Sequence, residues 1–246
     1  MSPSATDRTL RLAWMAARLI PDECRVFVGI GAPCSAAMLA RRSHAANIDM
    51  IFESGVMGAD PPRLPLSTGS PSVAAGALMV GSMLDVFATL QRGEIDIGLL
   101  SGAQVDRLGN LNSTVIGDPS APKLRLPGSG GAHDIAALAR DVLILMPHEP
   151  RRFVNQVDFV TSPGHVAGRS EATGLGNGPK AVATDRALFG FPDGEMTLVG
   201  HYADIEEDAA VEHVGWPVRK ADRVDLIDPP SAAIATAFRS FSGDTT

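Results

Sequence analysis

Two short apolar runs separated by a helix-length segment constrain the fold of this chain more than any other feature. The run RVFVGI (25–30) is rich in β-branched residues, and IDMIFES (48–54) follows it after a segment, 34–45, that suits one helix. Strand, helix and strand joined by tight connections form a βαβ unit, in which the two strands run parallel. The sequence therefore predicts an α/β protein.

The alternation of strands and helices continues beyond this unit. A helix over 82–92 precedes an apolar strand at 95–102. A strand, a glycine-rich bend and a helix then occupy 122–139, before a further buried strand at 141–147. Because each strand is followed by a helix, we expect an open, mostly parallel sheet flanked by helices.

The two ends of the chain are less regular. We expect residues 1–6 to be frayed and the first helix to be capped by Asp7. The region 55–71 should be a long loop, and a flexible loop is expected at 165–178. Within 1–246, read as a single domain, the irregular C-terminal third should hold additional strands at 151–164, 180–191 and 196–203, and helices near 204–213 and 231–240.

Composition and charge narrow the class of protein. The 246 residues carry a net charge of −7 and show no basic stripe, so we expect no nucleic-acid partner. No apolar stretch approaches the roughly 20 residues of a membrane helix, and no signal peptide is apparent, so we expect no membrane partner and a cytoplasmic location. Cys24, Cys34 and the histidines lack metal-ligand spacing, so we expect no metal.

The stretch ESGVMG (53–58) ends the second predicted strand on a carboxylate, Glu53. A buried charge is costly unless something pairs with it or uses it. The apolar residues before Glu53 suggest a buried approach, and Gly55 and Gly58 would leave the space over the carboxylate open. Three alternatives remain: a strand end that is solvated or paired with Arg63, a cofactor-binding acid, and a nucleophile that attacks an acyl carbonyl to form an anhydride.

A first glycine-rich bend, Gly29-x-Gly31, connects a strand to a helix in VFVGIGAPCS. Such glycines let the backbone approach a pyrophosphate, and Glu53 stands near the position of the ribose-binding acid in dinucleotide-binding proteins. Cys34 replaces the third glycine of that fingerprint. A plain turn, a phosphate or pantetheine contact, and a non-catalytic dinucleotide-binding module all remain open.

A second bend, LPGSGGAHD, places Gly128, Gly130 and Gly131 ahead of a helix. Its backbone N–H groups could bind an anion or stabilise an oxyanion, or the bend could be a plain loop. Polar side chains that could orient a substrate or form Asx turns follow the strand at 95–102: Gln104, Asp106, Asn110 and Asn112.

Three motifs in order, ESGVMG (53–58), GAQVDRLGNLNSTVIGD (102–118) and KLRLPGSGGAHDIA (123–136), resemble the β subunit of family I CoA-transferases. The glutaconate CoA-transferase branch is the most similar, and the resemblance is dense over 25–160. It implies that Glu53 is the catalytic nucleophile. Glu53 would form an acyl anhydride and then a γ-glutamyl-CoA thioester while CoA moves between carboxylic acids.

The resemblance also implies a binding site and a partner. The Gly130–Ala132 backbone would line the acyl-CoA site, and CoA would be a substrate, with no tightly bound cofactor. A homologous α subunit of similar size would complete an α2β2 or larger assembly. Together with the glycines and polar residues above, the expected substrate- or CoA-binding positions are Gly29, Gly31, Ser54, Gly55, Gln104, Asn110, Gly128, Gly130, Gly131 and Ala132.

Other functions of the same fold stay open at this point. Some branches that resemble CoA-thioester hydrolases or lyases replace the motif glutamate. This sequence keeps Glu53, which favours transfer, but a glutamyl-CoA thioester would still be hydrolysed if the site opened to water. A structural paralogue would keep the glutamate without turnover. Ser54 and the loop amides are the expected hydrogen-bond donors to an ionised Glu53. Arg63, Lys123 and Arg125 could bind a second substrate carboxylate or be solvated surface charges.

Overall fold

The computed structural model describes residues 4–165 and 174–243. Its helices are α1 (Ala5–Ala17), α2 (Ala32–Arg41), α3 (Met83–Gln91), α4 (Ala132–Leu138), α5 (Glu207–Val211) and α6 (Ala232–Ser242), with a 3₁₀ turn, η1, at Pro71–Ala74. Its strands are β1 (Arg25–Val28), β2 (Asp49–Phe52), β3 (Val56–Met57), β4 (Met79–Val80), β5 (Ile97–Leu100), β6 (Gln104–Val105), β7 (Leu111–Asn112), β8 (Val115–Ile116), β9 (Leu124–Arg125), β10 (Asp141–Leu145), β11 (Pro179–Ala183), β12 (Ala187–Gly190), β13 (Thr197–Tyr202) and β14 (Arg219–Ile227).

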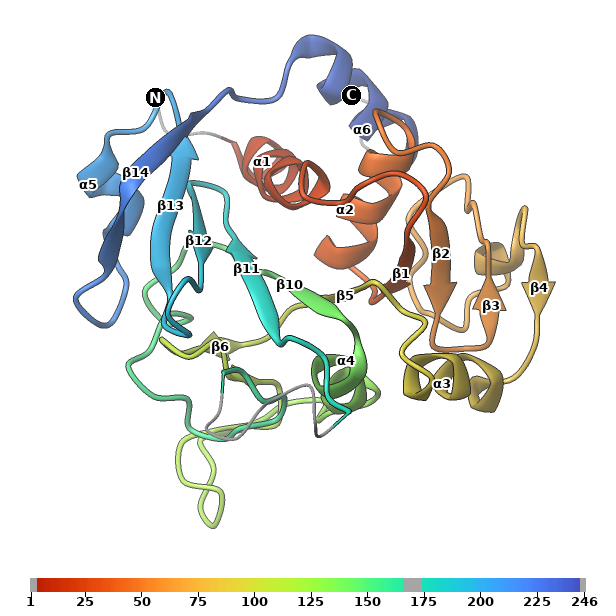
Figure 1. Cartoon of the computed structure of the whole chain (residues 1–246), viewed down its shortest axis with the longest axis horizontal. Helices are drawn as coiled ribbons and strands as arrows, with labels where there is room; N and C mark the ends of the chain where they lie inside the picture. The colour runs from red at the N-terminus through yellow and green to blue at the C-terminus, as the bar shows by residue number, and fades with distance from the viewer. Residues whose placement is uncertain (1–3, 166–173, 244–246) are drawn as a thin grey trace.

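One ten-stranded sheet runs through the molecule, in the order β14-β13-β12-β11-β10-β5-β1-β2-β3-β4 (Figure 1). The five central strands, from β11 to β2, are parallel to one another. Antiparallel pairs extend the sheet on both sides, through β12 and β13 at one end and β3 and β4 at the other. The predicted α/β class with an open, mostly parallel sheet is confirmed.

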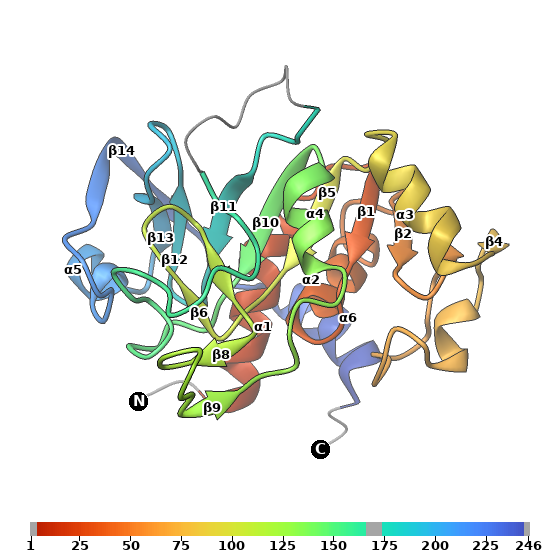
Figure 2. The same ribbon diagram turned by 90° about the horizontal axis from the view of Figure 1, so that it is seen from below.

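Helices cover both faces of the sheet, as Figures 1 and 2 show from two directions. Along β1, Val26 and Val28 contribute to the core under α1, α2 and α6, while Phe27 contributes to the core under α3 and α4. This alternation follows the two-residue period of a strand. Because both faces are covered, the central strands are apolar throughout, which is typical of parallel sheets.

The first helix begins earlier than predicted. Ser4 caps α1 by accepting a hydrogen bond from the Asp7 N–H at 3.1 Å, while the Asp7 carboxylate accepts one from the Ser4 N–H at 3.2 Å. This capping box satisfies N–H groups at the helix start. Asp7 is therefore the third helical residue and not the cap. Of residues 1–6, which we expected to be frayed, residues 4–6 form the cap and first turn, and residues 1–3 lie outside the described chain.

Two strand predictions in the C-terminal third are wrong. The segment 151–164 is a loop, held by isolated bridges from Val105 to Phe153 and from Leu111 to Ser162. The segment 180–191 is a hairpin of β11 and β12 instead of one strand, because the Thr184 hydroxyl accepts hydrogen bonds from the Arg186 and Ala187 N–H groups and closes a turn. Strand β14 has no counterpart among the predicted strands.

Several remaining predictions fall near the observed elements. The helices expected at 82–92 and 231–240 are present as α3 and α6, and the one near 204–213 is the short α5. The loop expected at 55–71 contains the two-residue strand β3. Most of the loop expected at 165–178 lies outside the described residues. In the described part of the chain, no helix is both long and apolar enough to span a membrane.

Candidate active site

The loops that follow the parallel strands meet at one edge of the sheet. Val28 is paired with Phe52 in the ladder between β1 and β2, so Gly29 and Glu53 begin adjacent loops. Open α/β sheets bind their ligands at this carboxyl edge. The first bend and the carboxylate predicted from the sequence therefore lie side by side.

Glu53 stands in a three-residue hairpin loop between β2 and β3. Phe52 pairs with Val56, and the Gly55 N–H donates to the Phe52 carbonyl oxygen at 3.0 Å. Gly55 has a φ of 108°, the left-handed conformation that closes such loops. Met50, Ile51 and Phe52 are fully buried, so the predicted buried approach is confirmed and Glu53 stands at the tip of a fixed hairpin.

Close packing accounts for Gly55 and Gly58, and the expectation that they leave the space over the carboxylate open stays a prediction. A β-carbon on Gly55 would overlap the Gly81 carbonyl oxygen. A β-carbon on Gly58 would lie 2.5 Å from Cγ of Leu78. Both glycines are required because neighbouring protein atoms occupy the space where a side chain would stand.

The second glycine-rich bend lies directly against the Glu53 carboxylate. A β-carbon built on Gly131 would lie 3.3 Å from Cδ of Glu53, and one on Gly130 would lie 3.8 Å from Oε1. The β-carbon built on Gly131 would also lie 2.6 Å from Cζ of Phe87, a residue of α3. The structure thus brings Glu53, Gly130 and Gly131 together, with Ala132 following as the first residue of α4.

The backbone of this bend presents unused hydrogen-bond donors. The Ala132 N–H donates to the Ser129 carbonyl oxygen at 3.0 Å and closes a turn around Gly130 and Gly131. Across residues 4–165 and 174–243, the N–H groups of these two glycines have no protein acceptor. Free backbone donors beside a carboxylate can stabilise negative charge that develops on a bound carbonyl oxygen.

Two residues that the sequence reasoning missed hold the bend in place. Ser113 clamps Gly128, because its carbonyl oxygen accepts the Gly128 N–H at 2.8 Å and its hydroxyl donates to the Gly128 carbonyl oxygen at 2.9 Å. Phe87 packs on Phe27 with ring centroids 5.7 Å apart and contacts the bend from the other side. Phe87 is the lone aromatic residue of the 82–92 segment, the one sequence signal that could have indicated it.

Gln104 is engaged by protein groups. Its Nε2 donates to Asp158 at 3.0 Å, and its Oε1 accepts from the side chain of Asn112 at 2.7 Å and from the Asp158 N–H at 3.1 Å. Asn112 directly precedes Ser113, the clamp of the bend. Gln104 therefore contributes to the support of the bend, and its contact with CoA stays a prediction.

Asn110 has a similar set of protein partners. Its side-chain nitrogen donates to the Asp106 carboxylate at 3.0 Å, and its oxygen accepts from the Gly164 N–H at 2.8 Å. Asp106 also accepts from the N–H groups of Leu108 and Asn110, which is an Asx-type turn. The Asx-type turn is therefore present at Asp106, and the contact of Asn110 with a substrate or CoA stays a prediction.

Other predicted residues line the edge with fewer contacts. Gly31 caps α2 with a φ of 75°, and no atom lies within 4 Å of the position of a β-carbon on it. Cys34, which replaces the third glycine, is buried in α2, and burial raises the pKa of its thiol to about 12, so it stays protonated near neutral pH.

The Ser54 hydroxyl is buried with no partner among the described residues, so the expected hydrogen bond to Glu53 is absent.

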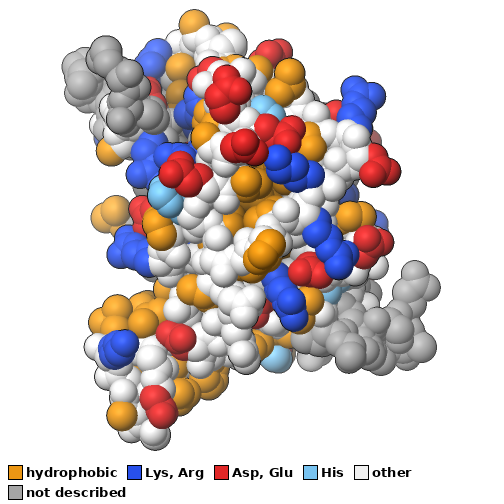
Figure 3. Space-filling model, turned by 90° about the vertical axis from the view of Figure 1, so that its left-hand side faces the viewer, with side chains coloured by type: hydrophobic (Ala, Val, Ile, Leu, Met, Phe, Trp, Pro, Cys, Tyr) orange, Lys and Arg blue, Asp and Glu red, His pale blue; other side chains and the backbone are white. Residues whose placement is uncertain are grey.

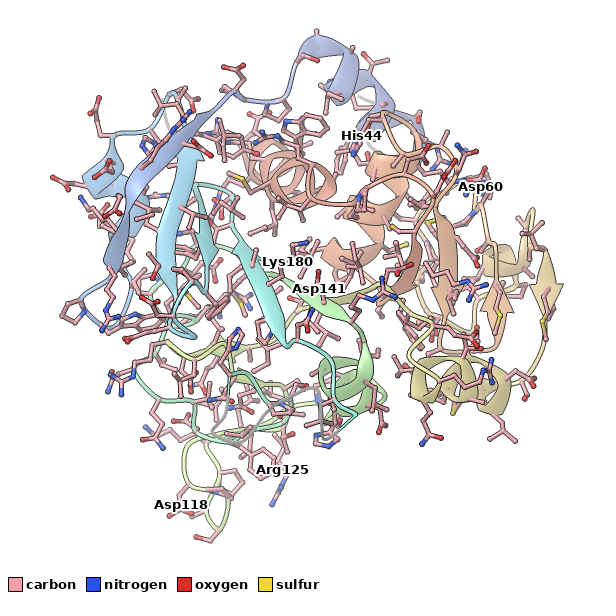
Figure 4. The ribbon with its side chains drawn as sticks, viewed as in Figure 1. His44, Asp60, Asp118, Arg125, Asp141 and Lys180 are labelled. Atoms are coloured by element: carbon pink, nitrogen blue, oxygen red, sulfur yellow. The ribbon has the colours of Figure 1, made fainter. Side chains whose placement is uncertain are left out.

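The cations considered for a second carboxylate lie on the surface. Arg63, Lys123 and Arg125 are all exposed. Figure 4 shows Arg125 on the arm that carries β8 and β9, with its side chain directed away from the sheet. Among residues 4–165 and 174–243, no group of three or more His, Cys, Asp or Glu residues could hold a metal ion.

Comparisons with known proteins agree with this arrangement. The model of the coenzyme A transferase family matches residues 9–202. The chain is 39% identical to the β subunit of 3-oxoadipate CoA-transferase of Pseudomonas knackmussii, over all of this chain and 96% of the relative. It is 35% identical to the β subunit of glutaconate CoA-transferase of Acidaminococcus fermentans, over 85% of this chain and 82% of the relative. The crystal structure of glutaconate CoA-transferase from that organism superposes with a TM-score of 0.86 and 31% identity, covering 96% of this chain and 94% of the other.

Proposed function

Because this chain belongs to the coenzyme A transferase family, as the β subunit of an enzyme that acts with a partner subunit, we propose that Glu53 is its nucleophile and coenzyme A its substrate. The contact between the Glu53 carboxylate and the Gly130–Gly131 bend carries the proposal. A carboxylate beside free backbone donors at the ligand-binding edge of the sheet supports this role.

The proposed reaction proceeds through two kinds of covalent intermediate. A Glu53 oxygen attacks the thioester carbonyl of the donor acyl-CoA, a C–O bond forms, the C–S bond breaks, and the CoA thiolate leaves an acyl-glutamyl anhydride. The thiolate then attacks the glutamyl carbonyl, which releases the donor carboxylate and forms a γ-glutamyl-CoA thioester. The acceptor carboxylate repeats these steps in reverse, so Glu53 is regenerated and no net proton is consumed.

The geometry suits this chemistry in two respects. Each attack passes through a tetrahedral intermediate whose oxyanion needs donors that are already in place. The N–H groups of Gly130 and Gly131 are such donors, because they are unused in the described chain and the bend is clamped by Ser113 and Phe87. The hairpin loop holds Glu53 at a fixed position, which reduces the entropic cost of the attack.

The relatives suggest the class of acid and the assembly. Two of them are named for 3-oxoadipate and glutaconate, which are short dicarboxylic acids, so we place the substrates of this chain in that class. Each of these relatives is named as one of the subunits of its enzyme, which supports an α partner, and we propose an α2β2 or larger assembly. A cytoplasmic location is consistent with Cys24 and Cys34, which are unpaired thiols in the structure.

A transfer assay tests the proposal. The chain is combined with its α partner, a donor acyl-CoA and an acceptor dicarboxylic acid, and the new acyl-CoA is followed by chromatography. We expect Glu53→Gln to abolish transfer, and Glu206→Gln, at an exposed glutamate that precedes α5, to leave it unchanged. Free thiol released without an acceptor acid would indicate hydrolysis, and NAD binding without transfer would indicate a dinucleotide module.

A further inference from the structure

Strand β14 is a long, open edge of the sheet. It has nine residues, lies beside β13 alone, and occupies the end of the strand order. Only Ile227 is buried; the side chain of Arg223 is 91% exposed and Leu226 is 69% exposed. Figure 3 shows that side of the molecule, where charged side chains of both signs surround hydrophobic ones.

Part of β14 has no partner within the sheet. Leu198 is paired with Lys220, but the next pair is Gly200 with Asp225. Residues 221–224 therefore face only one residue of β13, and their backbone N–H and C=O groups need other partners, which are water or another chain. An unpaired strand edge is a template on which a second strand can form.

We propose that β14 pairs antiparallel with β14 of a second copy of this chain, with Val224 on the twofold axis. Opposite residues in a symmetric antiparallel pair lie equally far on either side of the axis. Arg223 then faces Asp225 of the second copy, so two opposite-charge pairs form across the axis. Lys220 is already paired with Glu207 and Asp208 in its own chain and is not counted. Arg223 and Asp225 already contact each other at 3.2 Å within one chain, so the four side chains would alternate in sign.

The registers centred on residues 221, 222, 223 and 225 are disfavoured by the same charges. With the axis through Asp222, Arg223 or Asp225, that charged residue would face the same residue of the second copy. With the axis through Ala221, Arg219 would face Arg223 of the second copy. Like charges placed directly opposite destabilise a pair of strands. A twofold axis gives each copy the same contact surface, so this contact joins two copies of this chain and no more, as the proposed α2β2 assembly allows. This inference concerns assembly and is independent of the reaction proposed for Glu53.

Charge exchange between copies tests the proposal. Arg223→Asp and Asp225→Arg are made in separate full-length chains, and the mass in solution is measured by light scattering over a concentration series. The unmodified chain should have twice its 25.7 kDa mass. Each variant alone should be a monomer, because like charges then face each other. An equal mixture should regain the doubled mass, because each variant then faces its complement while the pair within each chain stays broken.

A cysteine on the proposed axis tests the register. Opposite residues of an antiparallel pair have Cα atoms about 4.5–5.5 Å apart, within disulfide range. Val224→Cys should therefore form a disulfide-linked dimer under mild oxidation, whereas Asp222→Cys, which faces Leu226, should not. The native Cys24 and Cys34 are buried and should not contribute. A monomeric unmodified chain, a mixture that stays monomeric, or equal crosslinking of both cysteine variants would overturn the proposal.

Discussion

Gly55 and Gly81 lie backbone against backbone beside the Glu53 loop. The Gly81 N–H donates to the Gly55 carbonyl oxygen at 2.9 Å, and a β-carbon on Gly55 would overlap the Gly81 carbonyl oxygen. Ser82, the next residue, caps α3 through a capping box with Asp85. The loop that carries the nucleophile is thus joined to the start of the helix that carries Phe87.

Gly55→Ala should destabilise the protein and remove activity. The substitution combines an unfavourable φ of 108° with the overlap at Gly81, so we expect a loss of about 2–4 kcal/mol in the free energy of unfolding. Urea unfolding measures it. Gly69→Ala is the matched control, because its β-carbon would meet only Ser67 Oγ at 3.8 Å, and it should change stability by no more than about 0.5 kcal/mol. Equal effects of the two substitutions would contradict this account.

Gly131→Ala should reduce turnover far more than stability. Gly131 has φ −81° and ψ 0°, which alanine adopts freely, but its β-carbon would press on Phe87 and on the Glu53 carboxylate. A displacement of about 1 Å at a reacting group can lower kcat about 100-fold. Adding Phe87→Leu should recover part of the loss, because the smaller side chain gives room. An unchanged kcat in Gly131→Ala would show that the bend does not fix Glu53.

Asn112→Ala should mainly reduce stability. Asn112 is fully buried, its nitrogen donates to Gln104 and to the Val115 carbonyl oxygen, and its oxygen accepts from the Thr114 N–H. Removing it leaves buried groups without partners, at a cost of about 3 kcal/mol in urea unfolding. The exposed Asn155 is the control, and Asn155→Ala should have almost no effect. If Asn112→Ala lowered the free energy of unfolding no more than Asn155→Ala does, Asn112 would not support the Gly128 bend.

Stability should fall as the pH decreases from about 7 to 5. His148 is buried, its Nε2 lies 2.7 Å from the Glu212 carbonyl oxygen, and burial lowers the pKa of its imidazole. The unfolded chain, with a histidine pKa of about 6.5, then binds a proton that the folded chain excludes. The contribution of neutral His148 to the free energy of unfolding is complete above pH 6.5. It is lost as the pH falls from 6.5 toward the lower pKa of His148 in the folded protein, with a slope of at most about 1.4 kcal/mol per pH unit.

A histidine replacement separates this effect from other titrations. His148→Gln removes the titrating ring, so urea midpoints measured between pH 7 and 5 should lose most of their slope, whatever the absolute stability of the variant. The same slope in both proteins would assign the pH dependence to another group.

The central βαβ pattern and the position of Glu53 could be predicted because both depend on local sequence. β-branched runs, helix-length segments and glycine breaks mark β1, α2 and β2 directly, and a charge after a buried strand marks its end. Strand β14 could not be predicted in this way, because its sequence RKADRVDLI is mostly charged and only Ile227 is buried. Its pairing with β13 comes from tertiary contacts and not from an apolar pattern.

The surroundings of Glu53 show the same limit. A glycine indicates a special backbone conformation or close packing, but not which neighbour fills the space. The sequence therefore does not reveal that protein atoms, and not a ligand, occupy the space beside Gly55 and Gly58. Phe87 and Ser113 reach the bend from distant segments, so their roles follow only from the folded structure.

Covalent trapping at Glu53 tests the central claim most directly. The chain and its α partner are incubated with an acyl-CoA, reduced with borohydride, digested and analysed by mass spectrometry. A γ-glutamyl thioester would be reduced to an alcohol, so the account predicts this mass change on the peptide that contains Glu53, and its absence in Glu53→Gln. Transfer of CoA with Glu53 unmodified, or with the change on another residue, would contradict the account.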